Sequence, residues 1–340
     1  MNTSDNSASP YTAQDLISDQ EVRWCPSCGD FSILKQLQIT LPKLGIPREK
    51  LVFVSGIGCS SRLPYYMNTF GVHTIHGRGP TFATGLKLAR PDLNIWLITG
   101  DGDGLSIGGN HLIHLLRRNI DMQVLLFNNR IYGLTKGQFS PVSEIGKITK
   151  SSPAGTTDPP FQTALLALGA GCTFFARTMD KEAKHMQQTF EQAATHSGTS
   201  LIEIYQNCNV FNDNAFLHLS DKVQQKENAL FLQEGLPLVF GQPGNEKVLL
   251  LKNTEVEVGE LSEYKTHPDV WIHEPENRTK AILLAQFDQN SVFPVPFGVI
   301  FRSTMQTISD VNTTSVDFNN SQEAINNLLE GENAWLITEK

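Results

Sequence analysis

The sequence lacks the features that direct a chain to a membrane or to a nucleic acid. No apolar run approaches the ~20 residues that a transmembrane helix needs. The N-terminus has neither the basic nor the apolar segment of a secretory signal, so we expect a cytoplasmic protein. Positive charge is also scarce: 27 Lys and Arg against 35 Asp and Glu give a net charge of −8. This balance argues against nucleic acid and against an anionic membrane surface as partners.

Cysteine is scarce as well, with five residues in 340, and a framework of disulfides is therefore not expected. Two of the five form Cys25-Pro-Ser-Cys28, while Cys59 and Cys208 each follow a short apolar run typical of a strand. Such a set suits an iron–sulfur cluster or a structural zinc ion, and the cysteines alone do not decide between them. A thioredoxin-type dithiol fits less well. We expect Cys172, which opens an apolar run, to pack as a small hydrophobic residue.

The length and the hydrophobic share of 40% predict one large α/β domain with additions. Residues 1–20 are rich in Ser, Asn and Asp and are typical of a flexible arm. Residues 21–234 carry the motifs described below and form the predicted core domain. From residue 235 to 340 the periodicity weakens, and we expect a smaller C-terminal extension that packs against another subunit.

The most informative pattern lies between residues 94 and 129. Residues 94–99 and 122–127 are short apolar runs typical of buried strands, and residues 105–118 have helical spacing. A strand–helix–strand unit makes its two strands parallel. Asp101, in Gly100-Asp-Gly102, and Asn129 therefore both follow the carboxyl end of a strand, which is where open α/β sheets bind ligands.

Asp101 and Asn129 supply two hard oxygen atoms, and Mg²⁺ prefers a few such ligands together with phosphate oxygens. The surrounding glycines allow close approach of the backbone, and a helix beginning near Ser106 offers free N–H groups to a phosphate. The pattern thus predicts a magnesium–diphosphate site. A glycine-rich turn without a ligand is the plainer alternative.

The segments GDGDGLSIGGNH, from residue 100, and NNRIYGLTKGQ, from residue 128, resemble the thiamine diphosphate motif of the β subunits of 2-oxoacid:ferredoxin oxidoreductases. The closest resemblance is to the 2-oxoglutarate enzymes, over residues 20 to 235. It implies a parallel sheet flanked by helices, with Mg²⁺ held by Asp101, Asn129 and the main-chain carbonyl of Ile131. The cofactor contacts that it implies are Ile57, Gly58, Cys59, Ser60, His76, Gly100, Asp101, Gly102, Asp103, Asn129 and Leu134.

The same resemblance includes Trp24-Cys-Pro-Ser-Cys-Gly-Asp30 and implies a [4Fe-4S] cluster on Cys25, Cys28, Cys59 and Cys208. The segment around Cys208 matches the family less closely than the others. A zinc ion on the same four cysteines is the alternative.

Arg62 and Lys136 resemble basic residues that stand near the substrate in this family, and a guanidinium suits the distal carboxylate of a dicarboxylic 2-oxoacid. The implied reaction oxidises 2-oxoglutarate with coenzyme A to succinyl-CoA and CO₂, and the electrons pass through the cluster to ferredoxin. Pyruvate or a branched 2-oxoacid is the alternative substrate, and a non-catalytic subunit stapled by zinc is the alternative of another class. No second α/β unit supplies the glutamate that thiamine enzymes need, so the resemblance implies an α partner that brings this glutamate and contacts to coenzyme A.

Overall fold

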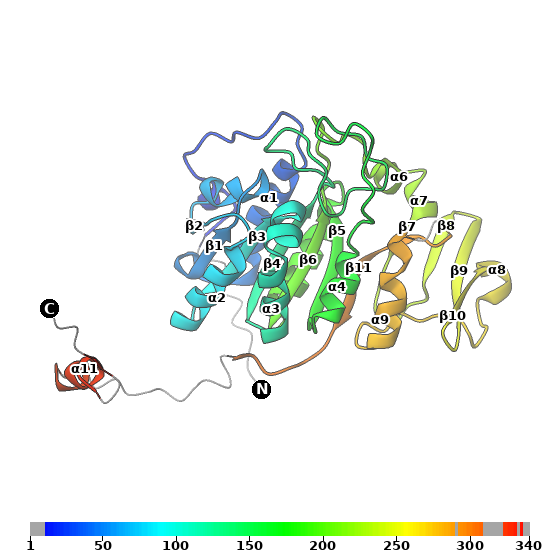
Figure 1. Cartoon of the computed structure of the whole chain (residues 1–340). Helices are drawn as coiled ribbons and strands as arrows, with labels where there is room; N and C mark the ends of the chain where they lie inside the picture. The colour runs from blue at the N-terminus through cyan, green and yellow to red at the C-terminus, as the bar shows by residue number, and fades with distance from the viewer. Residues whose placement is uncertain (1–10, 290–291, 309–321, 332–333, 336–340) are drawn as a thin grey trace.

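The computed structural model describes residues 11–289, 292–308, 322–331 and 334–335 (Figure 1). In these residues the main feature is an eight-stranded sheet with the order β2-β1-β3-β4-β6-β5-β11-β7. Its strands are β1 (Leu51–Ser55), β2 (Phe70–His73), β3 (Asn94–Gly100), β4 (Met122–Asn128), β5 (Phe174–Met179), β6 (Thr199–Tyr205), β7 (Ala229–Phe231) and β11 (Val295–Arg302).

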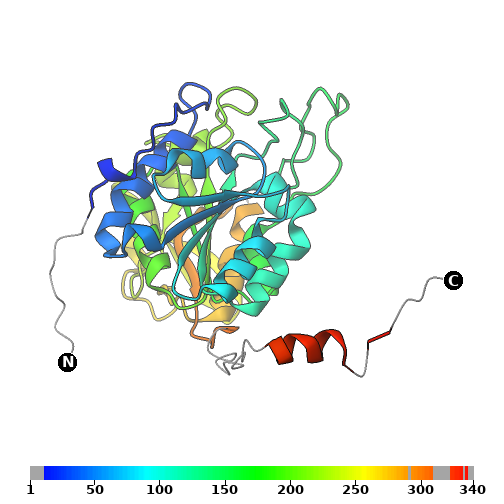
Figure 2. The same cartoon turned by 90° about the vertical axis from the view of Figure 1, so that its left-hand side faces the viewer.

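Helices cover both faces of this sheet, as Figures 1 and 2 show from two sides. One face carries α1 (Asp30–Thr40) and α5 (Ala183–Thr195). The other carries α2 (Gly79–Ala89), α3 (Gly109–Arg118), α4 (Thr163–Gly169) and α9 (Arg278–Ala285). Every residue of β1, β4, β5 and β6 is buried, which is the pattern of strands covered on both sides.

The predicted strand–helix–strand unit is confirmed. β3 and β4 pair in parallel, and α3 joins them on one face. The helix starts earlier than predicted, however, because the chain turns into helix directly after Gly100 and passes through a π-helical turn, η5 (Asp103–Ile107), before α3. No helix or strand lies between β4 and α4, so residues 136–160 form a long loop.

The predicted parallel sheet flanked by helices is present, but one pair of neighbouring strands is antiparallel. β11 pairs antiparallel with β5, and β7 pairs in parallel with β11 at the far edge. Residues 221–232 contain the short helix α7 (Gln225–Asn228) followed by β7. The predicted boundary at residue 234 is therefore crossed by the sheet, because β11 from the predicted extension completes the core.

The remainder of the extension does form a smaller unit. β8 (Val239–Gln242), β9 (Asn245–Lys252) and β10 (Glu255–Glu260) make a three-stranded antiparallel sheet. The other short elements are η1 (Gln14–Leu16), η2 (Leu41–Leu44), η3 (Arg48–Lys50), η4 (Ser60–Tyr66), η6 (Phe287–Gln289), α6 (Leu217–Ser220), α8 (Leu261–Tyr264) and α11 (Gln322–Leu329). Among the described helices, none combines the length and the apolar character that crossing a bilayer requires.

One further expectation changes at the N-terminal side. Residues 1–10 of the predicted flexible arm lie outside the described residues, but residues 11–20 pack on the domain. Tyr11 and Leu16 are buried, and the Tyr11 hydroxyl donates to the carbonyl of Ile46 at 2.8 Å. Residues 62–79 contain the end of η4 and the edge strand β2.

Candidate active site

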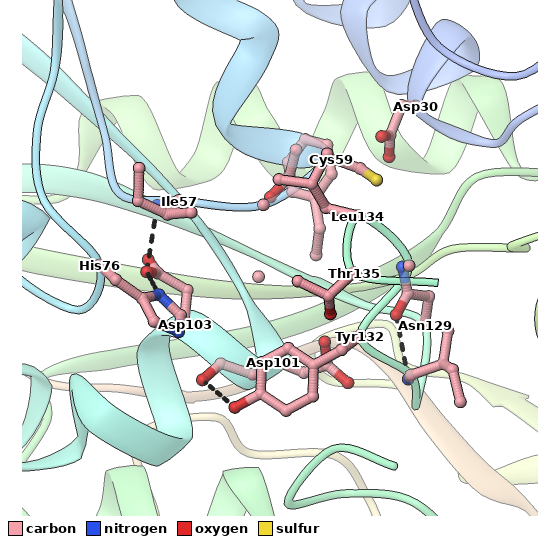
Figure 3. A pocket seen from close by; sticks show the side chains of 17 residues that line it. Asp30, Ile57, Cys59, His76, Asp101, Asp103, Asn129, Tyr132, Leu134 and Thr135 are labelled. Atoms are coloured by element: carbon pink, nitrogen blue, oxygen red, sulfur yellow. Dashed lines mark hydrogen bonds and ion pairs between the residues drawn. The ribbon is translucent and has the colours of Figure 1, made fainter. Parts of the chain in front are cut away.

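The predicted site residues gather at the carboxyl edge of the sheet. Asp101 follows β3, Asn129 follows β4, and the segment from Gly56 to Ser60 follows β1. These parallel strands end at the same edge, so three segments far apart in the sequence meet there (Figure 3).

A cavity of about 120 Å³ lies between these segments. All eleven residues predicted to contact the cofactor line it, as does Ile131. Ordinary cofactor sites enclose about 300–1,000 Å³. A second cavity of about 430 Å³ shares Ile57, Gly58 and Leu134 with the first, so the two adjoin.

Asp101 is a buried carboxylate in this cavity, with 3% of its surface exposed. Its Oδ2 accepts a hydrogen bond from the hydroxyl of Ser140 at 2.6 Å. Burial raises the pKa of Asp101 to about 7, although the Ser140 hydrogen bond and backbone N–H groups act in the opposite direction. A cation placed against this carboxylate would stabilise the charged form, which is the arrangement of a metal ligand.

Asn129 is fixed by its own backbone turn. Its Oδ1 accepts from the Ile131 amide at 3.1 Å, and its Nδ2 donates to the Oε1 of Gln206 at 2.9 Å. The intervening Arg130 has a φ of 56°, in the left-handed region. This turn brings the Asn129 side chain and Ile131 to one wall of the cavity.

Asp103 also lines the cavity, but its oxygens are engaged by the protein. Oδ1 accepts from the backbone amides of Ile57 (3.1 Å) and Gly77 (2.7 Å) and lies 2.6 Å from Nδ1 of His76. Oδ2 accepts from the Thr99 hydroxyl at 2.7 Å. Asp103 thus holds the loops at residues 57 and 76–77 together (Figure 3), a role that the spacing of the motif does not reveal.

The segments that carry the four predicted cluster ligands are tied to one another. Trp24, next to Cys25, donates from its indole to the carbonyl of Cys59 at 2.7 Å. Asn209, next to Cys208, donates to the carbonyl of Pro26 at 2.6 Å. The sulfurs of Cys59 and Cys208 also share a neighbour: a Cβ built on Gly133 would lie 3.5 and 3.6 Å from them.

The thiols themselves are close enough to interact electrostatically. Burial raises the pKa of Cys59 to about 12, and the Asp30 carboxylate and the thiols of Cys208 and Cys25 add to the effect. The pKa of Cys28 is raised for similar reasons, first by burial and then by Asp30. All five cysteines are free, and Cys172 is buried in the core as predicted. Within the described ranges, no three His, Cys, Asp or Glu side chains converge into a ready-made site for a metal ion.

The two predicted substrate residues are placed differently. Arg62 lines the second cavity together with Arg23, Tyr65 and His73. Lys136 is exposed, has a φ of 77°, and lines neither of these cavities.

Several lining residues were not predicted, among them Asp30, Phe127, Tyr132, Gly133 and Thr135. Tyr132 donates from its hydroxyl to the carbonyl of Gly102 at 2.9 Å, and its ring occupies the space where a Gly102 Cβ would be. Asp30 is 2% exposed, and it lies on the side of the cavity toward which the sulfur of Cys59 points (Figure 3). Its position directly after Cys28-Gly29 is the signal that could have found it.

Comparison with known proteins agrees with this geometry. Residues 56–204 match the family model described as thiamine pyrophosphate enzyme, C-terminal TPP binding domain. The 2-oxoglutarate oxidoreductase subunit KorB of Mycobacterium tuberculosis is 44% identical, over 96% of this chain and 89% of its own length. The chain belongs to the KorB family of 2-oxoglutarate oxidoreductase β subunits. It therefore contains a thiamine diphosphate-binding domain and is a subunit of an enzyme of this class.

Other relatives extend the comparison. Subunit β of 2-oxoacid:ferredoxin oxidoreductase 1 from Aeropyrum pernix is 45% identical over 56% of this chain and 60% of its own length. The 2-oxoglutarate:ferredoxin oxidoreductase of Magnetococcus marinus, solved with 2-oxoglutarate, coenzyme A and succinyl-CoA bound, matches with a TM-score of 0.72 and 29% identity. That match covers 89% of both chains, so the fold of this KorB-family chain is shared over most of its length.

Proposed function

We propose that this chain is the subunit that holds thiamine diphosphate, Mg²⁺ and a [4Fe-4S] cluster in a 2-oxoglutarate:ferredoxin oxidoreductase. With an α partner, the enzyme would convert 2-oxoglutarate and coenzyme A to succinyl-CoA and CO₂. Two electrons leave the substrate in this reaction, and ferredoxin would accept them one at a time. Thiamine diphosphate supplies the carbanion chemistry that decarboxylation of a 2-oxoacid requires.

The residues of the first cavity fit a magnesium–diphosphate group. Asp101 would bind Mg²⁺ through its carboxylate, Asn129 through its side-chain oxygen and Ile131 through its carbonyl. The burial of the Asp101 carboxylate supports this assignment, because Mg²⁺ would neutralise its charge. The segment that begins directly after Gly100 would offer backbone N–H groups to the diphosphate.

The cysteines fit a cluster at the same edge of the sheet. Their three segments are held near one another by hydrogen bonds that do not involve the thiols, and the four thiols of Cys25, Cys28, Cys59 and Cys208 would converge when iron binds. The raised pKa values of the Cys59 and Cys28 thiols apply to the chain without a metal ion. Bound iron would lower these pKa values, because a thiol that coordinates a metal ion is deprotonated. Cys59 also lines the cofactor cavity, so its thiolate would lie between the two groups.

Arg62 would bind the distal carboxylate of 2-oxoglutarate. It lines the cavity that adjoins the cofactor cavity. Arg23 and Glu21 also line that cavity, but they form an ion pair with each other at 2.8 Å, so Arg62 is the cation that favours a dicarboxylic acid over pyruvate or a branched 2-oxoacid. Lys136 lines neither cavity. We propose that it contacts the substrate only when a partner subunit covers the site.

The cavity would be completed by an α subunit. Among the described lining residues, the carboxylates are Asp30, Asp101 and Asp103, and no glutamate is present. The small volume of the first cavity is consistent with a wall supplied by the partner. The α subunit would bring the glutamate that engages the aminopyrimidine ring, as well as contacts to coenzyme A.

One observation carries the proposal: Asp101, Asn129 and Cys59 line the same cavity, although they follow three different strands. The test is co-expression with the α subunit under anaerobic conditions, followed by assays of iron, sulfide, thiamine diphosphate and 2-oxoacid-dependent viologen reduction that requires coenzyme A. We expect iron and sulfide to be present and 2-oxoglutarate to be the best substrate. A colourless, zinc-containing and inactive complex would support the non-catalytic alternative instead.

Substrate choice has its own test. R62A should lower kcat/KM for 2-oxoglutarate by about 10- to 100-fold, because hydrogen bonds to a charged group contribute about 1.5–3 kcal/mol. Its effect on residual pyruvate turnover should be small. R117A, which removes an exposed arginine from the last turn of α3, is the matched control and should change neither. Equal losses for both substrates in R62A would contradict the dicarboxylate assignment.

A further inference from the structure

Gln206 connects the two halves of the proposed site. It follows β6 directly and is 1% exposed. Its Oε1 accepts from Nδ2 of Asn129 at 2.9 Å, and its Nε2 donates to Sγ of Cys28 at 3.2 Å. One side-chain amide therefore contacts a proposed magnesium ligand on one side and a proposed cluster ligand on the other.

The surrounding backbone holds this amide in place. The Gln206 N–H donates to the carbonyl of Asn128 at 2.9 Å, which continues the pairing of β6 with β4. Nε2 also donates to the carbonyl of Asn207 at 2.6 Å. Asn207 is tied in turn to the cysteine turn, because its carbonyl accepts from the amide of Gly29 at 3.2 Å. Gln206 thus has little freedom to turn away.

The orientation of the amide follows from the donors around it. The backbone N–H of Ile131 can only donate, so Asn129 must present Oδ1 to it and Nδ2 to Gln206. Gln206 must then accept with Oε1, which leaves Nε2 facing the sulfur of Cys28. Rotating either amide by 180° would set donor against donor.

We propose that Gln206 is a positioning residue that serves both groups. It fixes the Asn129 amide so that Oδ1 is available to Mg²⁺, and its N–H stabilises the more negative, reduced state of the cluster through Cys28. Partners behind a metal ligand set the ligand's orientation, and hydrogen bonds to cluster sulfurs help set the reduction potential. This inference rests on the proposed function, because it concerns the magnesium and the cluster assigned there.

Two substitutions separate the two contacts. Q206M keeps the length of the side chain and removes both hydrogen bonds. Q206E keeps an oxygen that can accept from Asn129 but replaces the donor to Cys28 with a negative charge. Q36M is the matched control, since Gln36 is also buried and accepts one amide hydrogen bond, from Gln187 at 2.6 Å, between α1 and α5.

The experiment uses the complex with the α subunit and has two readouts besides activity. Mg²⁺-dependent binding of thiamine diphosphate is measured by titration calorimetry, and the midpoint potential of the cluster by redox titration followed with EPR. Q206M should weaken cofactor binding about tenfold. It should also shift the reduction equilibrium of the cluster about tenfold toward the oxidised form, or about 59 mV for one electron. Q206E should lower the potential while leaving cofactor binding nearly unchanged, and Q36M should alter neither.

Unchanged affinity and potential in Q206M, with iron and cofactor present in the wild type, would overturn this inference and leave the proposed function intact. A wild-type complex without iron and without cofactor binding would overturn both. If Q206M does not retain its iron, Q206E decides: an unchanged potential in Q206E contradicts the role at Cys28, and a lowered potential supports it.

Discussion

Arg177 is the residue whose replacement should cost the fold most. It lies in β5 with 0% exposure, and its Nε donates to Oε2 of Glu203 in β6 at 2.8 Å. Its Nη2 donates to Oδ2 of Asp288 in η6 at 3.3 Å. Glu203 in turn accepts from Nδ2 of Asn128 at 2.8 Å, so the network reaches the residue before Asn129.

R177M would leave Glu203, whose side chain is 1% exposed, without its cation. Breaking a buried ion pair on one side costs about 3–5 kcal/mol because a charge remains uncompensated. Domains are stable by only about 5–15 kcal/mol, so R177M should remove a large part of the total. The double variant R177M/E203Q removes the stranded charge as well and should be more stable than R177M alone, which is the sign of coupled residues.

The measurement is urea unfolding of the full-length chain, followed by tryptophan fluorescence, for the wild type, both single variants and the double variant. K247M removes one partner of the surface pair Lys247–Glu227, in which both side chains are 36% exposed, and should cost less than about 1 kcal/mol. A loss of stability in R177M no larger than that in K247M, or additive effects in the double variant, would show that Arg177 and Glu203 are not a coupled buried pair.

Four other substitutions give clear expectations. D101N should abolish Mg²⁺-dependent binding of thiamine diphosphate. The pKa of Asp101 is raised to about 7, so in the cofactor-free wild type its contribution is full below about pH 4 and is lost as pH rises through 7. D101N should reduce this loss in thermal melts, and an unchanged pH slope would contradict it. Burial lowers the pKa of His185 to about 4, so stability should fall, by at most about 3 kcal/mol, as pH drops from about 6.5 toward 4. Urea midpoints of H185Q should show a smaller fall, and equal falls would contradict the assignment. G102A should cost about 1–3 kcal/mol, because its Cβ would lie 2.1 Å from the Tyr132 ring, whereas G85A in α2 meets no atom within 4 Å and should stabilise by about 0.5–1 kcal/mol. Similar melting temperatures for the two alanine variants would contradict the packing described here.

The part of the fold nearest the site could be predicted because local patterns determine it. Residues 94–129 carry strand and helix periodicity with glycine at the turn, and a strand–helix–strand connection allows only one handedness. Strand β11 could not be placed in the same way. Its apolar run at residues 297–301 is that of any buried strand, and no local pattern reveals that it pairs antiparallel with β5. The same holds for β7, whose three residues become a strand by pairing with β11.

The role of a site residue could be predicted where a sequence motif determines it. It could not be predicted where contacts with residues from other segments determine it. The resemblance implied Asp101 as a magnesium ligand and Asp103 as a cofactor contact, and only the surrounding donors reveal that Asp103 connects two loops. Gln206 gave no signal in the sequence, since its contacts come from two other segments. Arg62 and Lys136 differ in placement because only Arg62 lies on η4, the short helix after β1, from which it lines the second cavity.

In the proposed enzyme the thiolates of Cys25, Cys28, Cys59 and Cys208 and the magnesium–diphosphate group share one edge of the sheet. EPR of the anaerobic complex with the α subunit, with and without 2-oxoglutarate, is the decisive measurement. We expect the signal of a reduced four-iron cluster when 2-oxoglutarate is added, and only if thiamine diphosphate and Mg²⁺ are present. A complex that contains iron and cofactor but whose cluster is not reduced by any 2-oxoacid would show that the two groups do not work together.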